Sequence, residues 1–144
     1  MRPMATSEAP PKIKIVIADQ QALFRQGVRS ILAQTDDIEI GSEVSSAQEL
    51  LATMNTLSPD IALIDINLPA IGNQELARTV KQQFPSTAVI LFTTNTNDEE
   101  LFLAIKSRAS GYLSRNVSPD ELITTIRRAA RGEHPINDSL LAHP

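Results

Sequence analysis

The chain of 144 residues has no cysteine and no tryptophan, and aromatic residues make up only 3% of it. Without cysteine it forms no disulfide and no thiolate metal site, and it has no cysteine nucleophile. Because aromatic side chains are scarce, a core built from the 42% of hydrophobic residues must be mostly aliphatic. We therefore expect one folded domain with an aliphatic core and no redox chemistry.

Long apolar runs are also lacking. No run approaches the roughly 18 residues that a membrane span needs, and the first residues have no apolar stretch typical of a secretory signal. The net charge of −4 disfavours binding of a nucleic-acid backbone by bulk electrostatics. These features predict a cytoplasmic protein without membrane contact, and any DNA contact is expected to come from outside this segment.

Short aliphatic and β-branched runs alternate with helical patterns along the chain. Five runs are candidate strands, at residues 13–17, 38–44, 61–64, 88–92 and 111–113. Three of them are nearly continuous aliphatic runs, which is typical of a parallel sheet covered on both faces. The alternation predicts right-handed βαβ units and a three-layer, doubly wound α/β domain.

The ends of the chain differ from its middle in composition. Residues 1–11 contain three prolines and small polar residues, which predicts a flexible leader. The domain is expected to cover residues 12–132, and residues 133–144 are read as a linker or tail. His134 and His143 in this tail are expected to be solvated rather than to bind a metal.

Helix signals lie between the candidate strands. Ser46 and Ser118 each stand three residues before a glutamate, the pattern of a capping box, and Pro119 suits the first helical position. Two segments have one apolar stripe each at helical spacing: Phe24, Val28, Ile31 and Leu32 in the first, and Leu122, Ile126, Ala129 and Ala130 in the last.

Three arginines crowd the end of the last helical segment, just before Gly132: Arg127, Arg128 and Arg131. One interpretation is a basic patch for a partner. The other is a helix C-terminus whose cations complement the helix dipole, and we favour this second interpretation.

Four polar residues stand at the carboxyl ends of predicted strands. Asp19 follows the first strand, Asp65 the third, Thr93 the fourth and Arg115 the fifth. In an open parallel sheet these ends converge on one crevice. Two acids, a hydroxyl and a cation suit a divalent ion together with a phosphoryl group, and a carboxylate can itself become an aspartyl phosphate.

Each of these residues also has a structural explanation. Asp19 is equally well placed to cap the first helix, and capping is compatible with metal binding. Asp65 lies within an apolar run, where an unpaired carboxylate is costly, so we favour a functional role. Thr93 and Arg115 say little on their own, and the hypothesis depends on all four residues together.

Three segments carry a more specific resemblance: IADQQALFRQG at residues 17–27, DIALIDINLP at 60–69 and ASGYL at 109–113. From about Lys12 to Gly132 the sequence resembles receiver domains of the NarL/FixJ (LuxR-type) class of response regulators. The resemblance implies a flavodoxin-like, chemotaxis-regulator-like (βα)5 sandwich whose five-stranded parallel sheet has the order 2-1-3-4-5.

The resemblance also implies roles for single residues. Asp65 matches the phosphoacceptor, which takes a phosphoryl group from a sensor histidine kinase or a small phosphodonor. Asp19, Asp65 and the backbone carbonyl of Asn67 match the ligands of Mg²⁺. Thr93 matches the switch hydroxyl, and Tyr112 the aromatic residue that follows its movement.

One further residue matches the pattern of the class, and several depart from it. Pro69 matches the proline that shapes the loop after the phosphoacceptor. Arg115, by contrast, stands where the class has a lysine. Gln20 replaces the second acid of the metal-binding pair, so the resemblance implies only weak Mg²⁺ binding. Smaller departures are Ala70 and Asn73 where glycines are usual, Asn116 in place of an acid, and Arg108 in place of a glycine.

For function, the resemblance implies a phosphorylation switch that controls transcription through a helix-turn-helix DNA-binding domain outside this chain, with a homodimer as the expected assembly. The departures leave open a pseudo-receiver that serves as a dimerisation or docking module. A nucleotide-binding enzyme is disfavoured because no glycine-rich loop follows the first strand. We expect no enzymatic activity beyond the domain's own phosphorylation and dephosphorylation.

Overall fold

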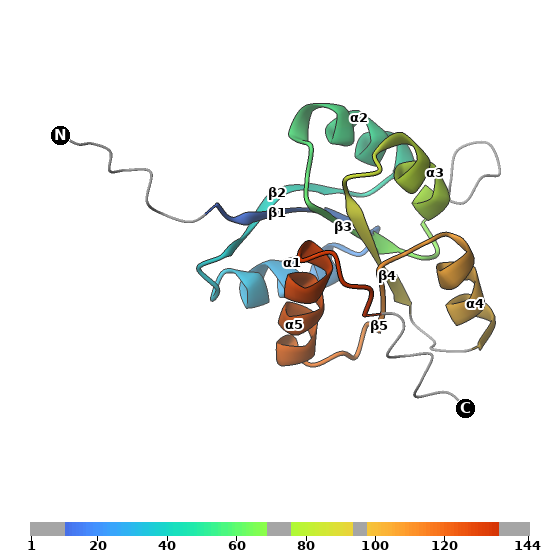
Figure 1. Cartoon of the computed structure of the whole chain (residues 1–144). Coiled ribbons are helices and arrows are strands. Elements are labelled where there is room, and N and C mark those ends of the chain that lie inside the picture. The colour runs from blue at the N-terminus through green and yellow to red at the C-terminus, as the bar shows by residue number, and fades with distance from the viewer. Residues whose placement is uncertain (1–10, 69–75, 94–97, 136–144) are drawn as a thin grey trace.

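A computed structural model describes residues 11–68, 76–93 and 98–135 of the chain (Figure 1). Strands and helices alternate along it. The strands are β1 (Ile13–Ala18), β2 (Ile38–Val44), β3 (Ile61–Asp65), β4 (Ala88–Thr93) and β5 (Gly111–Ser114). The helices are α1 (Ala22–Leu32), α2 (Ala47–Leu57), α3 (Leu76–Gln83), α4 (Asp98–Lys106) and α5 (Pro119–Ala130). The predicted alternation is confirmed.

The strands form one parallel sheet in the order β2-β1-β3-β4-β5, as the resemblance implies. In the pairing of β3 with β4, Asp65 lies beside Phe92. Four of the five strands run one residue beyond the predicted end, so Asp65 and Thr93 are the last residues of β3 and β4. The phosphoacceptor position is therefore part of the central sheet.

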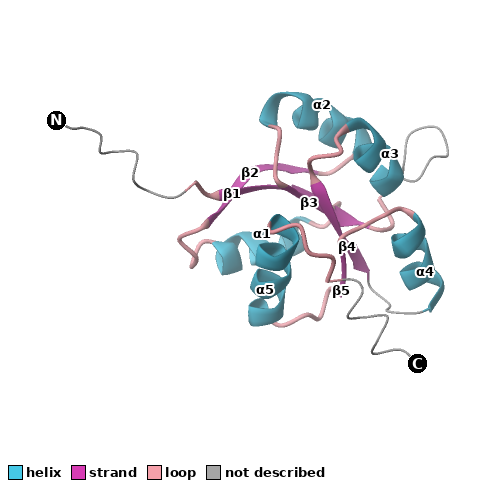
Figure 2. Ribbon diagram, in the orientation of Figure 1, coloured by secondary structure: helices cyan, strands magenta, loops and turns pink. Residues whose placement is uncertain are grey.

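Helices cover both faces of the sheet, with α1 and α5 on one side and α2, α3 and α4 on the other (Figures 1 and 2). Side chains alternate between the two cores along each strand: Ile15 and Ile17 of β1 lie in the cluster with α1 and α5, whereas Val16 and Ala18 lie in the other. Both clusters are almost entirely aliphatic, as expected. Within the described parts of the chain, no helix combines the length and apolarity needed to cross a membrane.

The two predicted capping boxes begin α2 and α5. The hydroxyl oxygen of Ser46 accepts from the Glu49 N–H and that of Ser118 from the Glu121 N–H, each at 3.1 Å. In a capping box the glutamate carboxylate accepts from the N–H of the N-cap serine. Here the Glu49 carboxylate accepts instead from the N–H of Ser45, the residue before the N-cap, at 2.9 Å. Both helix starts are thus held by the residues that the sequence indicates.

The arginines at the end of α5 are paired with acids. Arg127 forms two hydrogen bonds to the Asp37 carboxylate, each 2.9 Å long, and Arg128 and Arg131 both contact Glu133. Gly132 follows with φ of 86°, a conformation that favours glycine after a helix. These pairs support the structural interpretation of this cluster over a basic patch.

One local prediction is wrong, and one open alternative is decided. Ala130, predicted on the apolar stripe of α5, is the last residue of that helix and is exposed, whereas Thr125 is buried. The alternative that Asp19 caps α1 does not hold, because the N-cap residue is Gln21, and its side chain forms no capping bond. His134 is exposed, as expected of a solvated histidine.

Several predictions concern residues outside the described parts. Most of the predicted leader and tail, including His143, lies there, and the same holds for Pro69, Ala70 and Asn73. The proposed boundaries at residues 12 and 132 stay predictions.

Candidate functional site

Three of the four polar residues at the strand ends, Asp19, Asp65 and Arg115, are in contact through their side chains, and the backbone carbonyl of Thr93 is bonded to the N–H of Arg115. Asp19 and Thr93 are buried, with 1% and 0% of their surfaces exposed, and Asp65 is 9% exposed. Nη2 of Arg115 lies 2.5 Å from Oδ2 of Asp19 and 3.2 Å from Oδ2 of Asp65. One guanidinium nitrogen thus joins carboxylates from two neighbouring strands.

The other oxygen of each carboxylate accepts from the backbone two residues further on. Oδ1 of Asp19 accepts from the Gln21 N–H at 2.8 Å, and Oδ1 of Asp65 accepts from the Asn67 N–H at 2.9 Å. Every carboxylate oxygen at the site therefore has a partner within the chain. This explains how a largely apolar sheet tolerates two buried acids.

Phe24 supports the guanidinium from the side of α1. Cζ of Arg115 lies 4.2 Å from the centroid of the Phe24 ring, and this ring meets Phe92 edge to face at 4.9 Å. Nε and Nη1 of Arg115 are buried without a hydrogen-bond acceptor among the described residues. The aromatic face offsets part of their lost hydration.

The sequence indicated Phe24 only as one apolar position of a helical stripe. The sequence holds one hint that Phe24 belongs to the site. Phenylalanine is rare in this chain, with four in all, and Phe24 follows the turn that carries Asp19. Phe24 becomes part of the site because the Arg115 side chain extends toward it, and the spacing of residues in the sequence does not predict that direction.

A set of polar contacts fixes the turn between β1 and α1. The Asp19 N–H donates to the Val44 carbonyl at 3.0 Å, and Nη1 of Arg25 donates to the Asp19 carbonyl. Arg29 forms two hydrogen bonds to Glu43, of 2.6 and 2.8 Å, and these lower the pKa of the Glu43 carboxyl. Helix α1, which carries Phe24, is thereby tied to β2.

The residues present fit a divalent ion poorly. The two carboxylates already share Arg115, and Gln20, at the position of the missing acid, is exposed. Within the described residues no group of three histidine, cysteine or acidic side chains is arranged to hold a metal ion. Mg²⁺ binds reluctantly without carboxylates and near-ideal geometry, so this donor set disfavours it.

The predicted switch pair lies on the two strands beyond the acids. The Thr93 carbonyl accepts from the Arg115 N–H at 3.0 Å, which joins the ends of β4 and β5. Tyr112 is 7% exposed and belongs to the apolar cluster on the face covered by α2, α3 and α4. Its ring is therefore turned inward in this structure.

One of the smaller departures carries a structural cost. Arg108 has a φ of 65°, in the left-handed region that favours the glycine usual at this position. At Asn116 the backbone N–H donates to the Ser114 hydroxyl oxygen at 3.1 Å, a bond that does not depend on the asparagine side chain.

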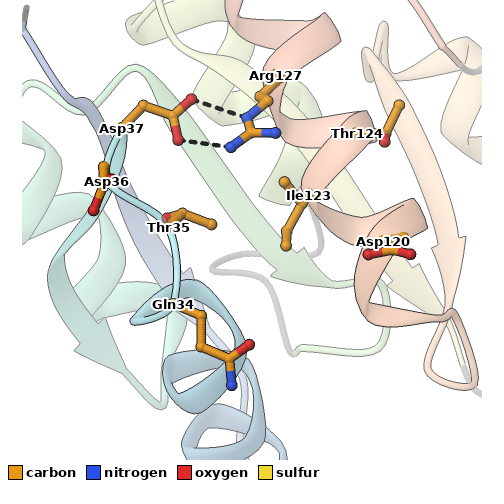
Figure 3. Close-up of a pocket in the computed structure, with 8 residues that line it drawn as sticks. All are labelled: Gln34, Thr35, Asp36, Asp37, Asp120, Ile123, Thr124 and Arg127. Carbon is orange, nitrogen blue, oxygen red and sulfur yellow. Dashed lines mark hydrogen bonds and ion pairs between the residues drawn. The ribbon is translucent and has the colours of Figure 1, made fainter.

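A hollow lies between the segment that joins α1 to β2 and helix α5 (Figure 3). Asp36, Asp37 and Asp120 contribute carboxylates to its wall, but Asp37 is held by the ion pair with Arg127. The hollow shares no residue with the strand-end site, which remains the candidate functional site.

A parallel sheet in this order, with acids, a buried hydroxyl and a cation at its carboxyl ends, defines a receiver-type α/β domain. Residues 15–127 match the family model of the response regulator receiver domain, so the chain belongs to that family. Its curated relatives, which include the response regulator NarL and the transcriptional regulatory protein DegU, place it among receiver domains of the NarL/LuxR type.

Among the curated relatives, the chain is 34% identical to the uncharacterised transcriptional regulatory protein YxjL of Bacillus subtilis, over 85% of this chain and 56% of that protein. It is 26% identical to the nitrate/nitrite response regulator NarL of Escherichia coli, over 88% of this chain and 58% of the relative. The chain therefore spans little more than half of each relative's length.

Solved structures show the same fold. The receiver domain of the response regulator NarL from Mycobacterium tuberculosis is similar with a TM-score of 0.79 at 24% identity, over 86% of this chain and all of that one. The response regulator RcsB from Salmonella typhimurium matches with a TM-score of 0.83 at 20% identity, over 92% of this chain and 68% of that one.

Proposed function

We propose that Asp65 accepts a phosphoryl group from a sensor histidine kinase in the cytoplasm. The observation that carries the proposal is the position of its carboxylate. It lies at the carboxyl end of β3 beside a guanidinium, and 11% of the side chain is exposed, against 2% for Asp19. Asp65 is thus the more accessible of the two acids at this edge of the sheet, where ligands of parallel sheets bind.

The chemistry follows from this placement. A carboxylate oxygen of Asp65 attacks the phosphorus of a phosphohistidine or of a small acyl phosphate. The bond from phosphorus to the leaving nitrogen or oxygen breaks, its electron pair stays with the leaving group, and Asp65 becomes an acyl phosphate. Arg115 offsets the negative charge that arrives with the phosphoryl group. The Thr93 hydroxyl is the proposed donor to a phosphoryl oxygen.

Thr93 and Tyr112 are the proposed route from the site to the surface. Both belong to adjacent strands, and Tyr112 packs in the cluster that contains residues of α4. A hydroxyl drawn toward a phosphoryl group frees space beneath it, and the inward or outward position of Tyr112 then differs between two states. This supports a two-state surface that favours a homodimer and regulates DNA binding by a domain elsewhere in the protein.

Receiver domains generally bind Mg²⁺ at the phosphorylation site. Here the implied ligands are Asp19, Asp65 and the Asn67 carbonyl, with Gln20 as the weakened position. We expect weak binding at most, because both carboxylates are shared with Arg115. Receiver domains are generally not classical enzymes, and the only reactions proposed here are gain and loss of the Asp65 phosphoryl group.

One observation favours the alternative of a docking module that needs no phosphorylation. All four carboxylate oxygens already have partners within the chain, so the site is stable without a ligand. Such a domain serves as a dimerisation or partner-binding unit in one fixed state.

Intact-mass spectrometry after incubation with acetyl phosphate, with and without Mg²⁺, distinguishes the two. The proposal expects a mass gain of one phosphoryl group that hydroxylamine removes, as it does for acyl phosphates. Asp65→Asn should abolish the gain. The matched control Asp60→Asn should retain it, because Asp60 lies before the opposite end of β3. Absence of an adduct in the unmodified chain at high Mg²⁺ would favour the docking module.

A further inference from the structure

The space between the two carboxylates of the site is filled by the protein itself. Oδ2 of Asp19 and Oδ2 of Asp65 both face Nη2 of Arg115, while their partner oxygens are held by backbone amides. A Mg²⁺ ion shared by both carboxylates needs oxygens at about 2.0–2.1 Å and near-octahedral order. The guanidinium nitrogen stands where such an ion has to lie.

We propose that Arg115 is the resident counter-cation of this site, and that a divalent ion binds the two carboxylates only after the guanidinium has moved away. The inference deepens the proposed function and rests on it for the role of the site in signalling. The charge of the site at rest is then set by the Arg115 side chain and not by the concentration of a divalent ion.

Several contacts hold the guanidinium in this position. Cζ of the guanidinium lies over the Phe24 ring, 4.2 Å from the ring centroid, and Phe92 supports that ring in turn. Only 12% of the Arg115 side chain is exposed. A lysine ammonium has no planar face to stack and swings aside on a flexible stem, so this placement depends on arginine.

The charges agree with this assignment. Two carboxylates and one guanidinium leave a single negative charge at the site, since Gln20 adds none. A divalent ion added beside an unmoved Arg115 would make the site positive, and repulsion between cations a few ångströms apart is strong where water is largely excluded. Geometry and charge therefore both oppose binding of the ion as long as the guanidinium of Arg115 stays between the carboxylates.

The test is an NMR titration of the folded chain with MgCl₂. Three hydrogens report directly: the amides of Gln21 and Asn67, which donate to the carboxylates, and the Nε–H of Arg115. In the unmodified chain we expect weak binding, with all three signals shifting together as the ion displaces the guanidinium.

Two variants separate position from charge. Arg115→Gln opens the space, and we expect the Mg²⁺ dissociation constant to fall about tenfold or more. Arg25→Gln is the matched control: it also removes a cation near Asp19, but Arg25 contacts only the backbone carbonyl there. We expect less than about a threefold change from this control, because a partly hydrated charge acts weakly at a distance.

Phe24→Leu keeps every charge of the site and removes only the stacking surface under Arg115. We expect it to tighten Mg²⁺ binding about threefold, the effect of one weakened cation–π contact. This variant also keeps the inference testable if Arg115→Gln leaves the paired acids too costly to fold.

Three results would overturn the inference. One is equal tightening by Arg115→Gln and Arg25→Gln, which reports net charge alone. Another is a shift of the Gln21 and Asn67 amides with an unchanged Arg115 Nε–H, which shows the ion and the guanidinium side by side. The third is no Mg²⁺ binding in the folded Arg115→Gln or Phe24→Leu variants. Phosphorylation enters none of these measurements, so the proposed function can fail on its own.

Discussion

Removal of the Arg115 side chain should destabilise the domain more than removal of any exposed arginine. In Arg115→Ala the carboxylates of Asp19 and Asp65 lose their shared cation while they stay largely buried. Breaking a buried ion pair by deleting one partner costs about 3–5 kcal/mol, and the contact with Phe24 adds up to ~1 kcal/mol. Against a free energy of unfolding of roughly 5–15 kcal/mol, this is a large fraction.

Urea unfolding followed by far-UV circular dichroism measures the loss, and Arg127→Ala is the matched control. Arg127 forms an equally regular pair with Asp37, but both side chains are 44% exposed. Exposed pairs contribute about 0–1 kcal/mol, so this variant should stay close to the unmodified chain. The two variants remove the same side chain and differ chiefly in the burial of its partners.

Addition of Mg²⁺ gives the second half of this prediction. If the metal replaces the missing cation of Arg115→Ala, binding to the folded state alone stabilises it by RT ln(1 + [Mg²⁺]/Kd), about 2.7 kcal/mol at a hundredfold excess over Kd. The unmodified chain and Arg127→Ala should gain much less. A loss in Arg115→Ala no larger than in Arg127→Ala would refute the reasoning, because the buried carboxylates would then not need their cation.

Three further outcomes are expected. Ser118→Ala removes the acceptor for the Glu121 N–H and should cost about 1 kcal/mol in urea unfolding. Hydrogen bonds from Arg29 lower the pKa of Glu43, so this pair stabilises the folded state fully above the ordinary pKa of glutamate. The stabilisation is lost as the pH falls through the lower pKa of the folded state. Arg29→Gln should therefore weaken the dependence of the free energy of unfolding on pH on the acid side. Arg108→Gly relieves a φ of 65° and should be neutral or stabilising by up to about 1 kcal/mol, whereas Arg108→Val should destabilise the domain.

Local patterns predicted the five strands and helices α1, α2 and α5, whereas α3 and α4 were expected only from the alternation and the strand order only from the resemblance. Buried parallel strands need continuous aliphatic runs, and such runs mark β3 and β4 clearly. Ser46 and Ser118 marked two helix starts through hydrogen bonds that span only three residues. The convergence of Asp19 and Asp65 followed from topology, since parallel strands end at one edge.

The contacts within the site were beyond reach of the sequence because they join distant segments through side-chain direction. Nothing in the spacing of Asp19 and Arg115 fixes a 2.5 Å contact between them. The same holds for the ring of Phe24 under the guanidinium, which depends on how α1 packs against the sheet. Capping of α1 by Asp19, which the sequence left open, does not occur because its carboxylate accepts from the N–H of Gln21, one residue before the helix begins.

The two main departures at the site make physical sense only together. A second acid in place of Gln20 would add a third negative charge beside the two carboxylates that share Arg115, and one guanidinium would leave two of the three charges uncompensated. A lysine in place of Arg115 would be a hydrated, movable cation beside the two acids. It would not pack on Phe24 as the guanidinium does, and the neutral amide of Gln20 would not add any charge. The observed pair instead yields a site whose cation is fixed by packing. Any phosphoryl group that reaches Asp65 must therefore compete for, or share, a guanidinium that Asp19 already holds at 2.5 Å.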